Sequence, residues 1–256
     1  MIHPTAIIDS KAELGAHVQV GPYSVIGPDV RIGSGTRIES HVVIKGPTTI
    51  GSNNHIYHFC SLGEAPQDKK YKGESTTLEI GDGNTIREYC TFNRGTVQDA
   101  GATRIGNDNW VMAYVHVAHD CQIGNNTIFA NNSSLAGHVI VHDHAILGGF
   151  TLVHQFCKIG AHVITAVGSV VFKDVPPYVT ASGYDAQPHG LNSEGLKRRG
   201  FSPETMLQLK RAYKTLYKSS LTLEEAKARL AEQQSECREI GTLLEFLNTS
   251  TRGIIR

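Results

Sequence analysis

The sequence predicts a parallel β-helix followed by an α-helical domain, because a six-residue repeat gives way to helical periodicity near residue 186. An aliphatic or aromatic residue returns at every sixth position over residues 2–62, 80–92 and 105–171, with Thr165 as the one polar member. A period of six fits neither a helix of 3.6 residues per turn nor the alternation of a flat strand. Short strands with a corner every six residues satisfy it, and three hexads make one triangular coil.

Each hexad has a second inward position, four residues after the first, where the side chain is small. Examples are Val18, Ser24, Thr36, Ser133 and four of the five cysteines, Cys60, Cys90, Cys121 and Cys157. We therefore expect buried, inert thiols and no disulfide framework. A glycine often follows the large inward residue, as at Gly33 and Gly148, and there we expect a corner with positive φ.

Two interruptions of the hexad, near residues 63–79 and 93–104, predict loops that leave the solenoid. Loops of this kind commonly carry function or contacts. The charges of the first loop taken alone favour a solvated charge run. The solenoid with its two insertions is expected to span residues 1–186.

The C-terminal domain is predicted to occupy residues 187–256. Ser202 followed by Pro203 is typical of a helix start, and Thr222 with Glu225 has the spacing of a capping box. We expect two or three helices over residues 203–249, part of which cap the end of the solenoid.

The charges limit the possible functions. Equal numbers of basic and acidic residues, 24 of each, exclude a nucleic-acid binder that relies on global charge. No run of about 18 apolar residues and no secretory signal are present, so we expect a cytoplasmic protein without a membrane span. The C-terminal domain carries a basic cluster that is either a solvated face or an anion-binding surface: Lys197, Arg198, Arg199, Lys210, Arg211, Lys214 and Lys218.

Histidines are the candidate chemical groups, and six of them lie in the regular solenoid off its inward positions: His116, His119, His138, His142, His144 and His154. One coil beyond His119 stands Gly137, which we expect to leave room for a substrate and to expose a backbone N–H suited to an oxyanion. The same offset places His138 over Asp120. Such a cluster fits a general base or a zinc site. Asp120 can serve His119 only if the backbone turns there.

Four segments carry a family resemblance: residues 116–121, 63–71, 154–157 and 192–201. Together they resemble the UDP-N-acetylglucosamine O-acyltransferases, a family of hexapeptide-repeat transferases, over essentially the whole chain. The resemblance implies a left-handed β-helix and a homotrimer with active sites between neighbouring solenoids. It also implies transfer of a 3-hydroxyacyl group from the phosphopantetheine of acyl carrier protein to the glucosamine 3-hydroxyl of UDP-N-acetylglucosamine, the first step of lipid A biosynthesis, without a metal or bound cofactor.

The resemblance further implies roles for individual residues. His119 would be the general base, Asp120 would orient it, and the Gly137 N–H would stabilise the oxyanion. Val167 would block the far end of the acyl groove and favour a shorter chain, while Asn93 departs from the His found there in some members. The substrate-binding residues implied are Gln67, Asp68, Lys70, His116, His138, His154, Gln155, Asn192, Glu194, Arg198 and Arg199. The last four of these would engage either the nucleotide or the carrier protein.

Two other functions are compatible with the pattern. A zinc-dependent lyase similar to the trimeric β-helical carbonic anhydrases would use the histidines as ligands. A non-catalytic scaffold or carrier-binding module would use only the surface.

Overall fold

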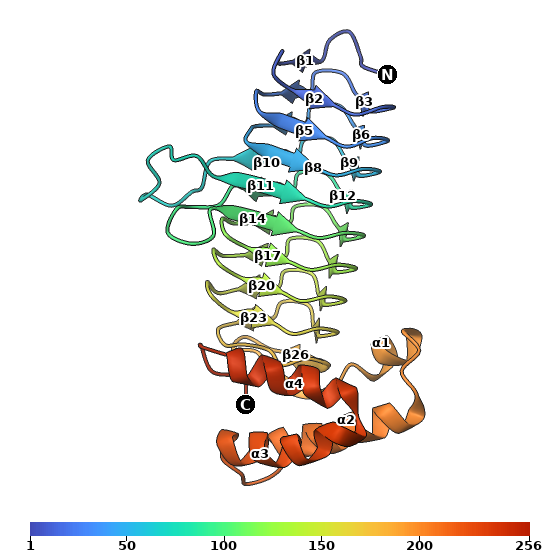
Figure 1. Ribbon diagram of the computed structural model, residues 1–256, viewed down its shortest axis with the longest axis vertical. Helices are drawn as coiled ribbons and strands as arrows, with labels where there is room; N and C mark the ends of the chain where they lie inside the picture. The colour runs from blue at the N-terminus through green and yellow to red at the C-terminus, as the bar shows by residue number, and fades with distance from the viewer.

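Three parallel β-sheets form the walls of a triangular solenoid in this computed structural model, and helices close its C-terminal end (Figure 1). The structure describes residues 1–256, apart from the side chain of Glu236. Up to residue 171 the chain visits the sheets in a fixed order, so each complete coil contributes one strand to each wall. The solenoid is the parallel β-helix that the repeat predicts, and it is left-handed, as the family resemblance implied.

Most strands are only two residues long, because the chain must turn a corner after each one. Sheet I contains β1 (Ile7–Ile8), β4 (Val25–Ile26), β7 (Val43–Ile44), β10 (Ser61–Glu64), β13 (Thr91–Asn93), β16 (His116–Val117), β19 (Ser134–Leu135), β22 (Leu152–Val153) and β25 (Val170–Val171). Sheet II contains β2 (Glu13–Leu14), β5 (Val30–Ile32), β8 (Thr48–Ile50), β11 (Thr77–Ile80), β14 (Ala102–Ile105), β17 (Gln122–Ile123), β20 (Ile140–Val141) and β23 (Lys158–Ile159). Sheet III contains β3 (Gln19–Val20), β6 (Arg37–Ile38), β9 (His55–Ile56), β12 (Thr85–Ile86), β15 (Trp110–Val111), β18 (Ile128–Phe129), β21 (Ile146–Leu147), β24 (Ile164–Thr165), β26 (Val179–Ser182) and β27 (Gln187–Leu191).

The register confirms a coil of three hexads. Val117 pairs with Leu135, and Leu135 pairs in turn with Val153, so partners in the regular coils are 18 residues apart. Both inward positions of the hexad are buried, the large one exemplified by Leu135 and the small one by Cys121. All five cysteines are buried free thiols. In the first coil Ile2 remains exposed, because no coil lies above it.

The glycines that follow the large inward residue have a different purpose from the one predicted. At Gly33 and Gly148 φ is not positive, but a Cβ would lie 2.5 Å from the backbone of the next coil in each case. The positive φ occurs two residues further on, mostly at non-glycine residues such as Asp120 and His138. Glycine is therefore needed for the close approach of successive coils, and the left-handed turn belongs to the position after next.

Three edges separate the sheets, and we name them corner I–II, corner II–III and corner III–I after the sheets they join. Both predicted loops leave the solenoid at corner I–II, as residues 65–76 between β10 and β11 and residues 94–101 between β13 and β14. Figure 1 shows the two loops projecting from the same side, half-way along the solenoid.

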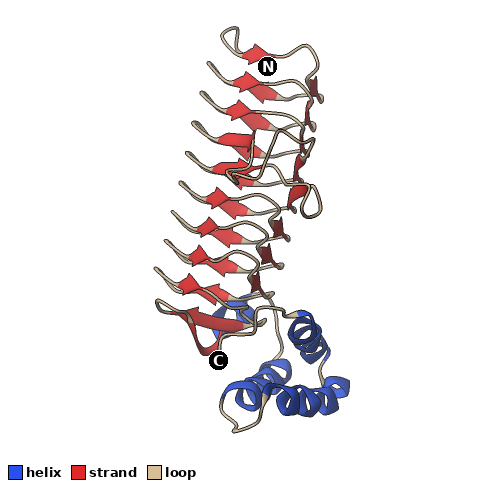
Figure 2. Cartoon of the chain, turned by 90° about the vertical axis from the view of Figure 1, so that its left-hand side faces the viewer, coloured by secondary structure: helices blue, strands red, loops and turns tan.

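The C-terminal region contains three helices over residues 203–249, where two or three were expected, and a short helix that the periodicity did not indicate. The helices are α1 (Ser193–Arg198), α2 (Pro203–Tyr217), α3 (Leu223–Gln233) and α4 (Arg238–Thr249), with a 3₁₀ turn at Gln234–Glu236. Ser202 caps α2 and Thr222 forms a capping box with Glu225, as predicted. Their apolar faces form a second core below the last coil (Figure 2).

The division predicted at residue 186 falls between β26 and β27, which pair antiparallel and extend sheet III. The first strand of the predicted helical domain thus belongs to the solenoid wall. Among the described residues, no helix is long and apolar enough to cross a bilayer.

Candidate active site

Corner I–II gathers the polar groups singled out in the sequence. The turns after β16, β19 and β22 carry His119, His138 and His154 respectively. The first and second loops arise at the same corner, two coils and one coil before the turn of His119. The stacking of coils therefore places residues from five successive turns along one edge. This confirms that these three histidines share an edge, whereas His142 and His144 lie at corner II–III.

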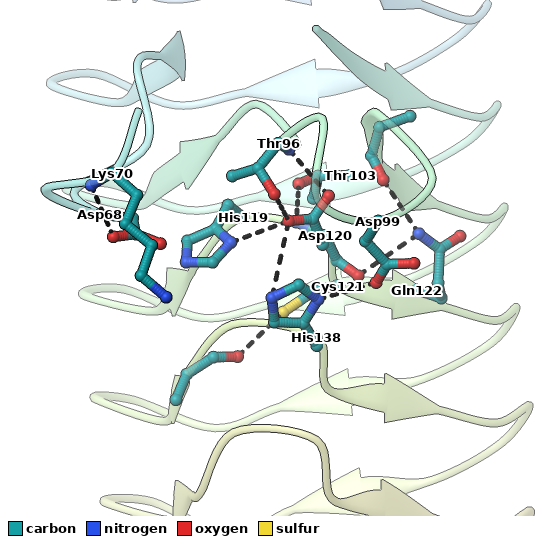
Figure 3. A network of polar contacts seen from close by, with 12 residues as sticks. Asp68, Lys70, Thr96, Asp99, Thr103, His119, Asp120, Cys121, Gln122 and His138 are labelled. Carbon is teal, nitrogen blue, oxygen red and sulfur yellow. Dashed lines mark hydrogen bonds and ion pairs between the residues drawn. The ribbon is translucent and has the colours of Figure 1, made fainter. Parts of the chain in front are cut away.

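His119 and Asp120 are adjacent residues whose side chains meet. Asp120 has φ of 60°, the left-handed value that recurs at this hexad position, and this turn is what the pairing required. His119 Nδ1 lies 2.9 Å from Asp120 Oδ2 (Figure 3). A carboxylate at Nδ1 fixes the proton there and leaves Nε2 as the free lone pair.

The Asp120 carboxylate is fully buried and held by the second loop. Thr96 donates its backbone N–H to Oδ1 at 2.8 Å and its hydroxyl to Oδ2 at 2.6 Å, while the Asp120 N–H donates to Thr103 Oγ1 at 2.8 Å. Burial alone would raise the pKa of Asp120, but the hydrogen bonds from His119 and Thr96 outweigh it and lower that pKa. The carboxylate is thus kept ionised beside the imidazole.

His138 lies between two carboxylates. Its Nδ1 is 2.7 Å from Asp99 Oδ2 and its Nε2 is 3.8 Å from Asp120 Oδ2. The ring stacks on Phe156 at a centroid distance of 4.4 Å and meets His119 edge-on at 5.1 Å. These contacts leave little rotational freedom to the imidazole.

The sequence reasoning missed Thr96 and Asp99. Both lie in the second loop, whose break in the hexad was visible, but no periodicity connected them to His119 or His138. The loop itself was the available signal, since residues that interrupt a regular solenoid are free to turn toward a site.

Gly137 does not leave the space that was predicted. A Cβ on Gly137 would lie 2.6 Å from His119 Cε1 and 2.8 Å from Nε2, so the imidazole itself fills the gap. The prediction of room for a substrate at that point was wrong, because the histidine leans along the solenoid onto the next coil. The Gly137 N–H donates no hydrogen bond to any described residue. It is therefore a free backbone donor next to the His119 ring.

The other residues implied at this corner are spread over neighbouring coils. His116 is outward-facing on β16 and shares a hydrogen bond of 2.7 Å with Thr91; burial lowers its pKa. His154 Nδ1 is 3.1 Å from the carbonyl oxygen of Gln155. Gln67, Asp68 and Lys70 lie in the first loop, where Asp68 Oδ1 accepts the Lys70 N–H at 2.9 Å.

The residues implied in nucleotide or carrier binding lie elsewhere on the chain. Asn192 caps α1 through its Oδ1 and donates Nδ2–H to the His162 carbonyl, so its amide is engaged in holding that helix. Glu194 pairs with Lys197 on the surface at 3.0 Å. Arg199 contacts His144 Nδ1 at 2.6 Å, which fixes α1 against corner II–III, away from the His119 edge of the same chain.

The His144 ring stacks on the ring of His162, and the pKa of His162 is shifted well away from its ordinary value. Burial, with the nearby His144 and Arg199, lowers the pKa of His162 to about 4. This imidazole is therefore neutral near pH 7, as burial and the neighbouring Arg199 guanidinium favour.

Val167 lies at corner III–I, between β24 and β25, and is 78% exposed. It is therefore on a different edge from His119. An acyl chain that starts at His119 reaches Val167 of the same solenoid only across the outer face of sheet I.

A metal site was the competing function for the histidines. His119, Asp120 and His138 each offer a ligand atom, and these atoms lie within 4.8 Å of one another. The same atoms, however, already form the His119–Asp120 hydrogen bond and the contact of His138 with Asp120. The arrangement is that of an imidazole oriented by a buried carboxylate, with a second imidazole beside it.

A left-handed solenoid of hexads with a His–Asp pair at one corner defines a hexapeptide-repeat transferase. The bacterial transferase hexapeptide model matches residues 11–46 and 102–137, and the second domain of UDP-N-acetylglucosamine O-acyltransferase matches residues 174–255. The chain belongs to the acyl-[acyl-carrier-protein]–UDP-N-acetylglucosamine O-acyltransferase family.

Relatives support this over the whole length. The family member of Thiobacillus denitrificans is 64% identical over 255 residues, which cover 100% of this chain and 99% of the relative. The solved structure of LpxA from Acinetobacter baumannii has a TM-score of 0.97 at 49% identity, covering 100% and 99% of the two chains. A structure of the Arabidopsis UDP-N-acetylglucosamine acyltransferase has a TM-score of 0.87 at 36% identity, with both chains fully covered. Family membership sets aside both the zinc lyase and the non-catalytic scaffold.

Proposed function

We propose that the chain transfers a 3-hydroxyacyl group from acyl carrier protein to the glucosamine 3-hydroxyl of UDP-N-acetylglucosamine, the first step of lipid A biosynthesis, with His119 as general base. The family supports the reaction, since its members are named for this acyl donor and acceptor. The single observation that carries the role of His119 is its bond to the buried Asp120, which orients Nε2 as the acceptor of a proton. A cytoplasmic location, as expected from the sequence, accompanies this proposal.

The chemical step uses groups of corner I–II. His119 Nε2 removes the proton of the sugar 3-hydroxyl as its oxygen attacks the thioester carbonyl carbon. The ionised Asp120 stabilises the imidazolium that forms, and the Gly137 N–H donates to the tetrahedral oxyanion. When the C–S bond breaks, the imidazolium returns its proton to the departing phosphopantetheine thiolate. No bound cofactor or metal enters the proposed step.

Assembly as a homotrimer is the second part of the proposal. His119 lies at corner I–II, whereas Arg199 contacts corner II–III, so one chain does not bring the two groups of implied residues together. A cyclic arrangement of three solenoids would place the corner of one chain against a different corner of its neighbour. The cleft between two chains would then receive the substrate.

A surface suited to such contact runs along corner III–I. Rings one coil apart lie against each other there, tilted or stacked, with centroid distances of 4.8–5.2 Å. Most of them are well exposed: Tyr23, His41, Phe59, Tyr89 and Tyr114. An exposed aromatic stripe of this length is typical of an interface. Light scattering should give about three times the chain mass of 27.8 kDa, and a fully active monomer would contradict the shared cleft.

The basic cluster supports docking of an acidic carrier protein. Lys210, Arg211, Lys214 and Lys218 of α2 and its C-cap surround a hollow whose apolar wall includes Leu207, a residue that is 50% exposed. Cations around an apolar centre suit an acidic, amphipathic partner, and attraction of this kind weakens as salt rises. Lys214→Glu changes a residue that lines this hollow, and we expect a higher KM for the carrier. Arg199 already contacts His144, so Arg198→Glu is the variant that tests α1, and it should impair use of either the carrier or the nucleotide. An unchanged KM would make the cluster a solvated face.

The decisive experiment on the reaction measures acyl transfer from the loaded carrier to UDP-N-acetylglucosamine by His119→Ala. Loss of a general base costs about 10² to 10⁴ in rate. His17→Ala, which removes an exposed imidazole in the first coil, is the matched control and should retain activity. Near wild-type turnover by a purified His119→Ala protein would remove His119 from the mechanism.

A further inference from the structure

The second loop does more than buttress Asp120, because it also holds the second imidazole of the site. Asp99 projects from residues 94–101, and its Oδ2 lies 2.7 Å from His138 Nδ1. The two residues are 39 positions apart in the chain, so only the folded loop brings them together. The contact closes a chain of polar groups that runs Asp99, His138, Asp120 and His119 (Figure 3).

In a histidine ring, the hydrogen bond made by one nitrogen determines whether the other nitrogen carries a proton or a free lone pair. A carboxylate at Nδ1 holds the proton there, so Nε2 is aimed at the opposite side of the ring. In His138 that side faces Asp120 Oδ2 at 3.8 Å, a distance too long for a direct hydrogen bond and open to a third group. Phe156 stacks on the face of the ring and holds its plane. Stacking alone does not distinguish this orientation from the one flipped by about 180° about the Cβ–Cγ bond, and it does not select the tautomer.

We propose that Asp99 is a positioning residue for the acyl transfer: by accepting the Nδ1–H of His138 it fixes the tautomer and direction of that ring, so that Nε2 points into the space beside the His119–Asp120 pair. This rests on the proposed function of that pair. The substrate group that Nε2 meets lies between the two histidines, where the sugar hydroxyl or the thioester oxygen reacts. Asp99 itself is half-exposed and acts only through His138.

The exposure of Asp99 indicates that its contact with His138 matters for the orientation of that ring more than for the stability of the fold. A side chain that is 48% exposed contributes little to folding through an ion pair with a neighbouring ring. Its value lies in the direction it gives to His138, whose side chain is only 14% exposed. Removal of Asp99 should therefore affect turnover more than stability.

The test compares Asp99→Ala with Asp99→Asn in steady-state acyl transfer to UDP-N-acetylglucosamine. Alanine removes the acceptor and should lower kcat by about tenfold to a hundredfold, the range of a hydrogen bond to a charged group. Asparagine keeps an acceptor oxygen and should retain most of the turnover. Gln98→Ala, in the same loop, is the matched control, since its side chain makes no hydrogen bond to any described residue.

Two further measurements separate positioning from a general effect on the loop, which also holds Asp120 through Thr96. In a His138→Ala background, Asp99→Ala should cause no additional loss, whereas a loosened loop would still impair Asp120 and lower kcat again. Nitrogen NMR of the His138 ring should show Nδ1 protonated in the parent and a changed tautomer in Asp99→Ala.

Each result has a distinct meaning. Full activity of Asp99→Ala, an unchanged His138 tautomer, or an equal loss in the His138→Ala background would overturn the proposed role of Asp99. Full activity of His138→Ala would overturn it as well, by removing His138 from the site. The role of His119 is tested separately by His119→Ala, so failure of the reaction mechanism is distinguishable from failure of this inference.

Discussion

Replacing Gly137 by alanine should disable the site while leaving the solenoid intact. The added Cβ would lie 2.6 Å from His119 Cε1 and 2.8 Å from Nε2, distances that are far below a van der Waals contact. Gly137 does not adopt a positive φ, so the backbone accepts alanine without strain. The imidazole must therefore move, by about 1 Å, to restore ordinary contact.

A displacement of this size at a reacting group costs about 10²-fold in rate, or about 2.7 kcal/mol in activation free energy. The Gly137 N–H is retained, so the loss would report the position of the base and not the removal of a donor. The free energy of unfolding should change little, because the His119 side chain is partly exposed and can swing outward.

The assay is single-turnover acyl transfer together with a urea unfolding curve for each protein. Gly149→Ala is the matched control: it also lies at a solenoid corner, but its Cβ would meet the nearest atom, the Asn131 carbonyl oxygen, at an ordinary 3.4 Å. We expect Gly149→Ala to keep its activity. If Gly137→Ala retains kcat within about twofold, either His119 is not the base or its position is not critical, and the reasoning fails.

Three further predictions concern acid stability, the buried amides and the acyl chain. The pKa of Asp120 in the folded protein lies below its ordinary value of 3.8. The stability that this ionised carboxylate contributes is therefore complete above the unfolded pKa and is lost as pH falls through the lowered folded pKa. In acid unfolding, the difference in free energy of unfolding between the parent and Asp120→Asn should shrink below about pH 4. Asn84→Ala should lower the free energy of unfolding in urea by about 1–3 kcal/mol without changing kcat, because it leaves the Asn109 N–H without its acceptor in the interior; an unchanged midpoint would contradict this. Val167→Gly should shift preference toward longer 3-hydroxyacyl donors, since two methylenes that cannot enter forfeit about 1.6 kcal/mol, more than tenfold; an identical chain-length profile in a competition assay would place the end of the groove elsewhere.

The sequence alone determined the solenoid. A large residue at every sixth position and a small one four later can be buried together only in a coil of three short strands, and Leu135 and Cys121 occupy those two positions as expected. The helix starts at Ser202 and Thr222 were likewise predictable, because capping depends on side chains within a few residues of each other. The offset of one coil also placed His138 over Asp120 correctly.

Other features depended on contacts that no local pattern records. The hexad indicated glycine corners with positive φ, but the structure assigns that conformation to the position of Asp120, where it allows the carboxylate to reach His119. Gly137 was expected to leave a gap, and the histidine fills it.

Only the tertiary structure decided how the irregular parts meet the regular solenoid. Thr96 and Asp99 reach Asp120 and His138 because the second loop folds back onto the coils that follow it. Likewise Arg199 and Val167 lie at corners away from His119, although the repeat could not show which edge each of them faces. The repeat can be recognised in the sequence because the large inward position of every hexad is filled by a residue that must be buried. A loop residue, in contrast, is placed by contacts with one particular side chain. The identity of that partner is fixed only when the chain has folded.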